Sequence, residues 1–266
     1  MPVVTTNTAA NSAIRFLNNN SSMAANSVGK LASGSRIVRA SDDAAGLAIS
    51  AKLSADTTAL KQAATNASQA ASIIQVADGG LARIGDVLQR MKALAAQSLS
   101  GAVTNTERGY INTEYSALNS EIADIITTTQ FNGQQLINTF NQSFFVGSSA
   151  SHTITANLTA TTVAGPGGDV SSSANASTAM GNIDTQIGNV STSRANAGAL
   201  ISRFETRGQA VATSIENIEA ANSVIKDVDL AAEQSRLVSA NVLTQAAVSA
   251  LSQANQIPQS LLRVLQ

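Results

Sequence analysis

The chain has 266 residues, a formal net charge of −1, and charged side chains at only 12% of its positions. This balance leaves no basic excess for binding nucleic acid, and the lack of cysteine excludes disulfides, thiolate catalysis and zinc–thiolate sites. No segment resembles a cleavable signal peptide, and no window approaches the roughly 18 apolar residues of a membrane span. We therefore expect a chain that is soluble, or one that leaves the cell without a cleavable signal.

The residues before Gly34 predict a weakly amphipathic helix. Its seam positions recur at steps of three and four: Ala10, Ile14, Leu17, Ser21, Ala24, Val28 and Leu31. These side chains are few and small to medium in size, so their burial cannot offset the conformational entropy that is lost when the segment becomes ordered. We therefore expect this end of the chain to become ordered only when many copies pack together.

The stretch SGSRIVRASDDAAGLAIS, residues 33–50, concentrates charge that is sparse elsewhere. A catalytic or metal-binding cluster is one interpretation, and a joint between two helices is the other. Asp42 and Asp43 lack the alternating oxygen ligands and the following glycine of a calcium loop. We favour the joint, with Arg36 and Arg39 on the connecting segment.

Capping signals support this joint. Gly34 is a typical residue for ending the first helix. Ser41 is a plausible N-cap of the next helix, which places the two following aspartates in its first turn, where the helix dipole favours negative charge.

Three further stretches predict long helices that pack against one another. Apolar residues recur every 3.5 positions on average from Leu60 to Ala95, from Ile111 to Ile125 and from Ile183 to Ile225. This spacing is typical of coiled-coil packing. We expect one continuous helix through Gly79–Gly80 with close helix contact there, and an Arg194 whose charged end stays in water.

The middle of the chain predicts β-hairpins. Residues 130–138, 142–149 and 151–163 are rich in Thr, Phe, Ile and Val, and Asn132–Gly133 is a turn signal. A loop rich in Ser, Thr and Gly then runs to about Ser173, where the next helix follows.

Residues that carry chemistry are sparse. His152 is the only histidine and lies on the polar face of a predicted strand, with only Asp169 nearby in sequence, so we interpret it as an exposed bystander. No Ser/His/Asp triad, HExxH motif, P-loop or GxGxxG motif is present. We therefore predict a protein that is not an enzyme and that has no cofactor or metal site.

The C-terminal end predicts another helix with little charge. Its apolar residues are Val238, Val242, Ala246, Ala250, Ile257, Leu261, Leu262 and Leu265. We expect this helix to pair with the N-terminal one. The predicted fold is mainly α: a long coiled-coil helical bundle rod with a small β-hairpin region in the middle of the chain and with paired N- and C-termini.

Four stretches resemble signatures of the bacterial flagellins, the subunits of the flagellar filament. They are LASGSRIVRASDDAAGLAIS (31–50), VLQRMKALAAQS (87–98), QFNG (130–133) and ALSQANQIPQSLLRVLQ (250–266), in the order of the family. The resemblance covers essentially the whole chain. It implies an inner-core domain of residues 1–42 plus 227–266 and a helical domain with β-hairpins, residues 43–226. A short loop at about 159–173 stands where many flagellins carry large variable outer domains, which indicates a minimal flagellin.

The resemblance implies a structural subunit that polymerises with itself into the flagellar filament, the helical propeller for motility, without catalysis. It also implies type III export, a secreted location in the extracellular flagellum, and contacts with other flagellins, hook–filament junction proteins, the filament cap protein and an export chaperone. No nucleic acid or membrane is implied as a partner. The implied inner-core self-assembly residues are Ile14, Leu17, Ala24, Val28, Leu31, Val238, Val242, Ala246, Leu251, Ile257, Leu261, Leu262 and Leu265. The charged joint becomes a hinge with inter-subunit contacts, formed by Arg36, Arg39, Asp42 and Asp43.

A receptor contact is also implied by the resemblance. In some flagellins the positions that match Gln89, Arg90, Leu94 and Glu114 are contacted by Toll-like receptor 5. Here the neighbouring residues 91–93 depart from the pattern of responsive flagellins. We favour the alternative that this face of the helix belongs to the bundle seam and to a subunit contact.

Two other functions are alternatives. A hook–filament junction protein of the same apparatus shares the terminal helices, but the four signatures together favour flagellin. A membrane-active amphipathic secretion protein is expected to carry a long apolar hairpin, and the sequence shows none.

Overall fold

The computed structural model describes the backbone of residues 6–264 and the side chains of residues 6–256. The elements in chain order are α1 (Thr8–Ser33), α2 (Ala44–Leu99), α3 (Asn105–Thr128), β1 (Gln130–Phe131), β2 (Gln134–Gln135), β3 (Asn141–Phe145), β4 (Thr153–Asn157), α4 (Ser173–Lys226) and α5 (Leu230–Val264). The fold is mainly α with two small antiparallel hairpins in the middle of the chain, as predicted.

Internal contacts divide the chain into two compact units. Unit 1 contains residues 1–55 and 217–266, and unit 2 contains residues 56–216. The helices break at residues 34–43 and 227–229, close to the predicted limits of the two domains. The assignment of those domains stays a prediction.

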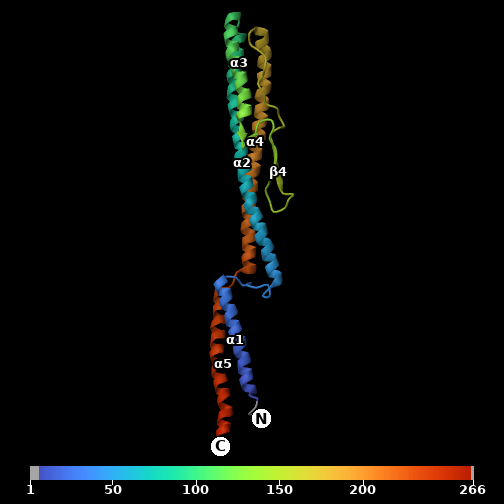
Figure 1. Ribbon diagram of the computed structural model, residues 1–266. Helices are drawn as coiled ribbons and strands as arrows, with labels where there is room; N and C mark the ends of the chain where they lie inside the picture. The colour runs from blue at the N-terminus through green and yellow to red at the C-terminus, as the bar shows by residue number, and fades with distance from the viewer. Residues whose placement is uncertain (1–5, 265–266) are drawn as a thin grey trace. The chain divides into compact units, whose positions relative to one another are not determined.

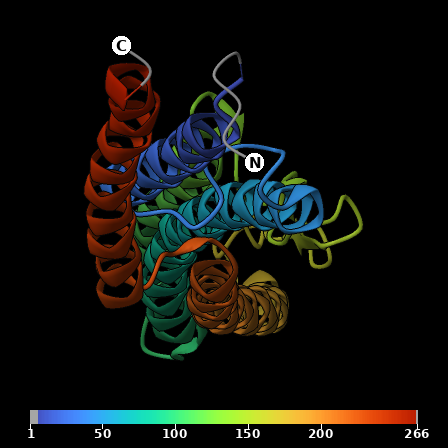
Figure 2. The same cartoon turned by 90° about the horizontal axis from the view of Figure 1, so that it is seen from below.

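In unit 1, α1 packs antiparallel against α5, so the two ends of the chain are paired as predicted (Figures 1 and 2). Asn7 caps α1, because its side-chain oxygen accepts a bond from the Ala10 N–H over 3.0 Å. The Asn7 amide also donates to the Ala254 carbonyl over 2.8 Å. One side chain therefore both starts α1 and joins it to α5.

In unit 2, α2, α3 and α4 lie side by side and share a core (Figure 1). Every seam position predicted on α2 is buried: Leu60, Ala63, Ala67, Ala70, Ile74, Ala77, Leu81, Ile84, Leu88, Met91 and Ala95. Tyr115 and Ile122 of α3 and Ile183 of α4 complete one core cluster. The 3.5-residue spacing therefore predicted this bundle correctly.

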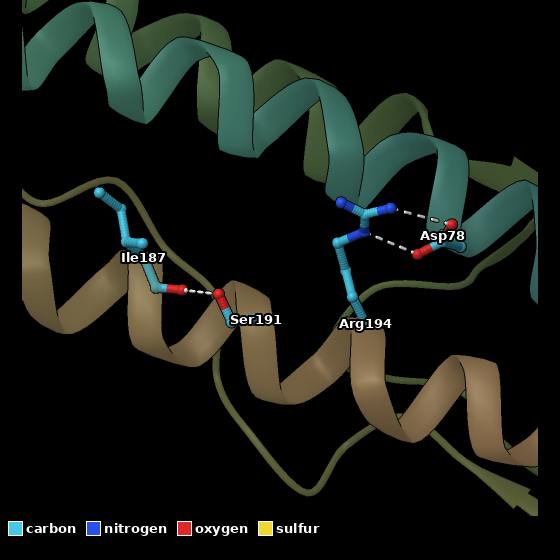
Figure 3. A network of polar contacts seen from close by, with 4 residues as sticks. All are labelled: Asp78, Ile187, Ser191 and Arg194. Atoms are coloured by element: carbon cyan, nitrogen blue, oxygen red, sulfur yellow. Dashed lines mark hydrogen bonds and ion pairs between the residues drawn. The ribbon is translucent and has the colours of Figure 1, made fainter.

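Ion pairs join α2 and α4 at the surface of unit 2. The Arg194 guanidinium of α4 reaches Asp78 of α2, with an Nε–Oδ1 distance of 2.9 Å (Figure 3). Lys92 and Asp184 form a second pair between the same helices. Arg194 thus keeps its charged end at the surface, as predicted, but the neighbouring Ser193, and not Arg194, is the buried residue at this level of α4.

The hairpins are shorter than the predicted strands. β1 and β2 meet at Asn132–Gly133, whose φ angles of 50° and 77° are those of a type I′ turn. On β4, Ile154 and Ala156 point into the core, which confirms the predicted alternation. The strand ends at Asn157, because its side chain accepts bonds from the N–H and hydroxyl of Thr159 and turns the chain.

The loop between β4 and α4 is held at two buried valines, Val163 by the segment between β2 and β3 and Val170 by α2 and α3. The Asn138 side chain both donates to the Val163 carbonyl (2.7 Å) and accepts from the Val163 N–H (2.8 Å). The Ser98 hydroxyl donates to the Val170 carbonyl over 2.6 Å, and Asn112 accepts from the Val170 N–H over 2.9 Å. These side chains satisfy backbone groups that have no strand or helix partner.

Candidate assembly surfaces

The segment that connects α1 to α2 is bound to the residues at the end of α4. The first helix ends where Gly34 takes a left-handed backbone, with φ 67°, as predicted. The Arg36 N–H donates to the Lys226 carbonyl over 2.6 Å, and the Val228 N–H donates to the Gly34 carbonyl over 3.1 Å. The Arg36 guanidinium donates to the Ile225 carbonyl over 2.9 Å. Arg36 therefore caps carbonyls that lack helical partners at the end of α4.

Asp42 stabilises a turn before α2. Its carboxylate accepts bonds from the N–H groups of Val38 (3.1 Å) and Arg39 (2.9 Å). These bonds, with that from Arg39 the larger cause, lower the pKa of Asp42. The side chain of Arg39 is exposed.

Asp43 is the N-cap of α2. Its Oδ1 accepts from the Gly46 N–H over 2.8 Å, and α2 begins at Ala44. The prediction that Ser41 caps the helix is therefore wrong, and only the second aspartate contacts the first turn. The reason is the preceding turn, in which the Asp42 N–H and carboxylate hold a non-helical backbone.

The predicted self-assembly residues of α1 and α5 fall into three sets. The exposed set contains Ile14, Val28, Val238, Val242 and Ala246. The half-buried set contains Leu17, Ala24, Leu31 and Leu251. Ile257, Leu261, Leu262 and Leu265 lie outside the residues whose side chains the structure describes. The assembly role of all these residues stays a prediction.

The side chains that α1 and α5 bury against each other are small. Five are the alanines Ala10, Ala13, Ala240, Ala247 and Ala254, and the polar Ser27 lies among them. Sequence reasoning missed Ala13, Ser27, Ala240, Ala247 and Ala254, because it placed neighbouring residues in the seams of both helices. On α5 the predicted seam residues Val238, Val242, Ala246 and Ala250 are exposed.

Glu233 of α5 was missed as well. It is only 4% exposed. Its carboxylate accepts from the Ser27 hydroxyl and lies 3.1 Å from the Arg236 guanidinium. The Ser27 bond first and Arg236 next lower the pKa of Glu233, although its burial opposes this shift. The signal in the sequence was its position, four residues before Leu237 on the same helix face.

Unit 1 carries most of the exposed large apolar side chains among the described residues. Unit 2 exposes only Val76, Tyr110 and Phe131 in this class, within the part of the chain that the structure describes. Those of unit 1 are Ile14, Phe16, Met23, Val28, Val38, Leu47, Ile49, Val224, Leu230, Val238, Val242, Leu243 and Val248. So many exposed aliphatic side chains are typical of a surface that another chain covers.

The four residues of the receptor prediction do not share one exposed face. Gln89, Arg90 and Glu114 are exposed, whereas Leu94 is 3% exposed and belongs to the core of unit 2. Arg90 and Glu114 form an ion pair of 2.7 Å between α2 and α3. Recognition of this face by Toll-like receptor 5 stays a prediction.

Among the described residues, no three His, Asp or Glu side chains gather as metal ligands do. In that same part of the chain, no helix combines the length and apolarity needed to cross a membrane.

Comparisons with known proteins point to one family. Residues 4–142 match the bacterial flagellin N-terminal helical region, and residues 180–265 match the bacterial flagellin C-terminal helical region. The flagellin of Halalkalibacterium halodurans is 39% identical over 243 residues, which cover 89% of each chain. The flagellar filament 33 kDa core protein of Treponema phagedenis is 35% identical over 284 aligned positions, which cover 99% of each chain.

A solved structure is also similar. The crystal structure of Bacillus cereus flagellin has a TM-score of 0.50 and 27% identity, and the match covers 59% of this chain and 94% of that one. The two family regions include α1, α2 and α5, the helices from which the terminal pair and much of the bundle are built. With relatives of matching length at this identity, the chain belongs to the bacterial flagellin family.

Proposed function

We propose that this filament subunit joins its neighbours through the outward faces of α1 and α5. The observation that carries the proposal is the exposure of Val238 (52%) and Val242 (59%) beside a seam of buried alanines. Alanine lets two helices approach closely but adds little hydrophobic free energy. The larger aliphatic side chains gain hydrophobic free energy only when another copy of the chain covers them. Polymerisation is therefore the step that makes the terminal pair stable.

The joint takes part in the same assembly. Arg36, Asp42 and Asp43 shape the joint within one subunit through the bonds described above. The exposed Arg39 is left for contact with a neighbouring copy, where repeated charges favour one relative position of the subunits. The joint thus acts as a hinge between an inner-core domain of residues 1–42 plus 227–266 and the helical domain of residues 43–226.

The partners and location follow from this role. The subunit is exported through the flagellar type III apparatus with the help of a chaperone, and it assembles outside the cell beneath a cap protein. Junction proteins link the filament to the hook. The junction-protein alternative is not favoured, because the relatives described above are flagellins and filament core proteins.

The test compares assembly of the double variant Val238→Ser/Val242→Ser with that of the native chain. Serine and valine have similar helix propensities, so the isolated chain keeps its helicity. Losing these methyl groups from a buried face weakens each subunit contact by about 2 kcal/mol, which raises the critical concentration roughly 30-fold.

The critical concentration is measured by sedimentation, and negative-stain electron microscopy shows the filaments. Val238→Ile/Val242→Ile is the matched control, and we expect it to assemble at least as readily as the native chain. An unchanged critical concentration for the serine variant contradicts the assignment of these faces. Failure of the native chain to form filaments contradicts the function itself.

A further inference from the structure

The face that α1 packs against α5 is less apolar than a neighbouring face that the same helix could have packed there. The helix could pack in either of two rotations about its own axis, which we call settings. Both settings place Ala10, Leu17, Ala24 and Leu31 in the seam. One setting adds Ala13, Asn20 and Ser27 to them, and the other adds Ile14, Ser21 and Val28. The two settings differ by a turn of α1 about its axis of roughly half the 100° step between successive residues.

Hydrophobic burial alone favours the setting that is not observed. Ile14 and Val28 are 42% and 51% exposed, whereas the smaller Ala13 and Ser27 are 9% and 6% exposed. A different interaction must outweigh the loss of apolar burial.

Glu233 supplies that interaction. Its buried carboxylate accepts a bond from the Ser27 hydroxyl, and Arg236 and Lys30 are the positive charges that act on it. If α1 turned to its other setting, Ser27 would leave the seam and this carboxylate would lose its partner from α1. The carboxylate would then keep only Arg236 of its own helix. Loss of a hydrogen bond to a buried charge costs more than covering the exposed parts of two aliphatic side chains gains, so the carboxylate decides the setting.

We propose that Glu233 is a positioning residue that holds α1 in the setting in which Ile14 and Val28 face outward, free for a second copy of the chain. This inference rests on the proposed function only for what covers those two residues. Buried polar pairs select one arrangement among several in coiled coils, at a cost in stability. Glu233 has that effect in a pair of helices whose other seam residues are mostly alanine and leucine.

Glu233→Leu tests the proposal. Leucine removes the carboxylate that needs Ser27 and favours the setting that buries Ile14 and Val28. We expect the critical concentration for filaments to rise at least tenfold, while the helicity of the isolated chain stays the same or increases. Glu233→Gln keeps a polar group that bonds to Ser27, so we expect it to retain the native setting and near-native assembly. Glu216→Leu removes an exposed carboxylate from unit 2 and is the control for the lost charge.

Cysteine cross-linking reports the setting directly, because the native chain has no cysteine. The bonds from Asn7 to Ala254 and from Ser27 to Glu233 place Ala13 level with Ala247. In the native background, Ala13→Cys/Ala247→Cys should form an intramolecular disulfide more readily than Ile14→Cys/Ala247→Cys.

In the Glu233→Leu background that preference should reverse, in filaments and in the fraction of the soluble chain whose terminal helices are paired at the time of oxidation. An unchanged preference in the Glu233→Leu background overturns the inference, whether or not filaments form. Absence of filaments from the native chain is a separate result, which bears only on the proposed function.

Discussion

Two adjacent glycines of α2 offer a test with a built-in control. A Cβ atom added at Gly80 would lie 2.5 Å from Oγ1 and 2.7 Å from Cγ2 of Thr129, and 3.1 Å from Cδ1 of Ile137. A Cβ atom added at Gly79 meets no atom within 4 Å. Both residues lie inside the same helix, so Gly→Ala has the same effect on helix propensity at each. The two substitutions therefore differ only in packing.

The expected difference follows from two opposing effects. Replacing a glycine inside a helix with alanine stabilises by about 1 kcal/mol. Overpacking a closed contact costs about 1–3 kcal/mol, and Thr129 cannot yield freely, because its hydroxyl and N–H both bond to the Ile125 carbonyl at the end of α3. We expect Gly79→Ala to stabilise unit 2 by about 1 kcal/mol and Gly80→Ala to be neutral or to destabilise it by up to about 2 kcal/mol.

Urea unfolding measures both variants against the native chain. Tyr115 is fully buried in unit 2, whereas Tyr110, the only other tyrosine, is 74% exposed, and the chain has no tryptophan. The near-ultraviolet circular dichroism of Tyr115 therefore reports on unit 2. With an m-value of about 2 kcal/mol/M, the midpoints of the two variants should differ by about 0.5–1.5 M. Equal shifts in the same direction would refute the close contact between Gly80 and Thr129.

Three further predictions test other parts of the structure. Phe204 is 1% exposed and meets Phe144 edge to face at 5.7 Å, so Phe204→Ala should cost unit 2 about 3–5 kcal/mol in urea unfolding, and the half-buried Phe144→Ala clearly less. Asp43→Ala removes the N-cap of α2 and should cost about 1 kcal/mol of stability, whereas Asp43→Asn retains the cap. Altered filament assembly or shape in electron microscopy with the alanine variant alone supports the role of the joint. Normal filaments from both variants count against that role. The pKa of Asp42 is lowered, so its bonds stabilise the turn at pH values above the ordinary carboxyl pKa, and this stabilisation is lost as the pH falls through the lower folded pKa. Carbon NMR should show a lower titration midpoint for Asp42 in the native chain than in the urea-unfolded chain. Equal midpoints contradict this prediction.

The sequence predicted the bundle of unit 2 better than it predicted the terminal pair. From Leu60 to Ala95 every predicted seam position is buried, and those from Leu81 to Ala95 share a core with residues of α3 and α4, so period and burial agree. In α1 the period is equally regular, yet Ile14 and Val28 are exposed while Ala13 and Ser27 are buried. A period alone leaves open which of two adjacent residues turns inward, and the partner of Ser27 lies some two hundred positions away in the sequence.

The helix ends at the joint were also predicted in part. Gly34 ends α1 because glycine takes a positive φ at little cost. The N-cap was assigned two residues too early, to Ser41, because serine and aspartate are nearly equal as N-caps. The choice between them depends on the turn that Asp42 closes with Val38 and Arg39, and propensities do not describe such a turn.

The joint also exposes large apolar side chains. Val38, Val224 and Leu230 are 46%, 81% and 58% exposed, and all three lie in unit 1 close in sequence to the bonds that Arg36 makes. A hinge that served only to connect two helices has no need of large apolar side chains in water. Charge at the joint is largely satisfied within the chain, since Arg36, Asp42 and Asp43 all have backbone partners, whereas the apolar side chains are not covered. We therefore expect the internal polar bonds to give the joint its shape. The uncovered Val38, Val224 and Leu230, together with Arg39, are expected to contact a neighbouring copy.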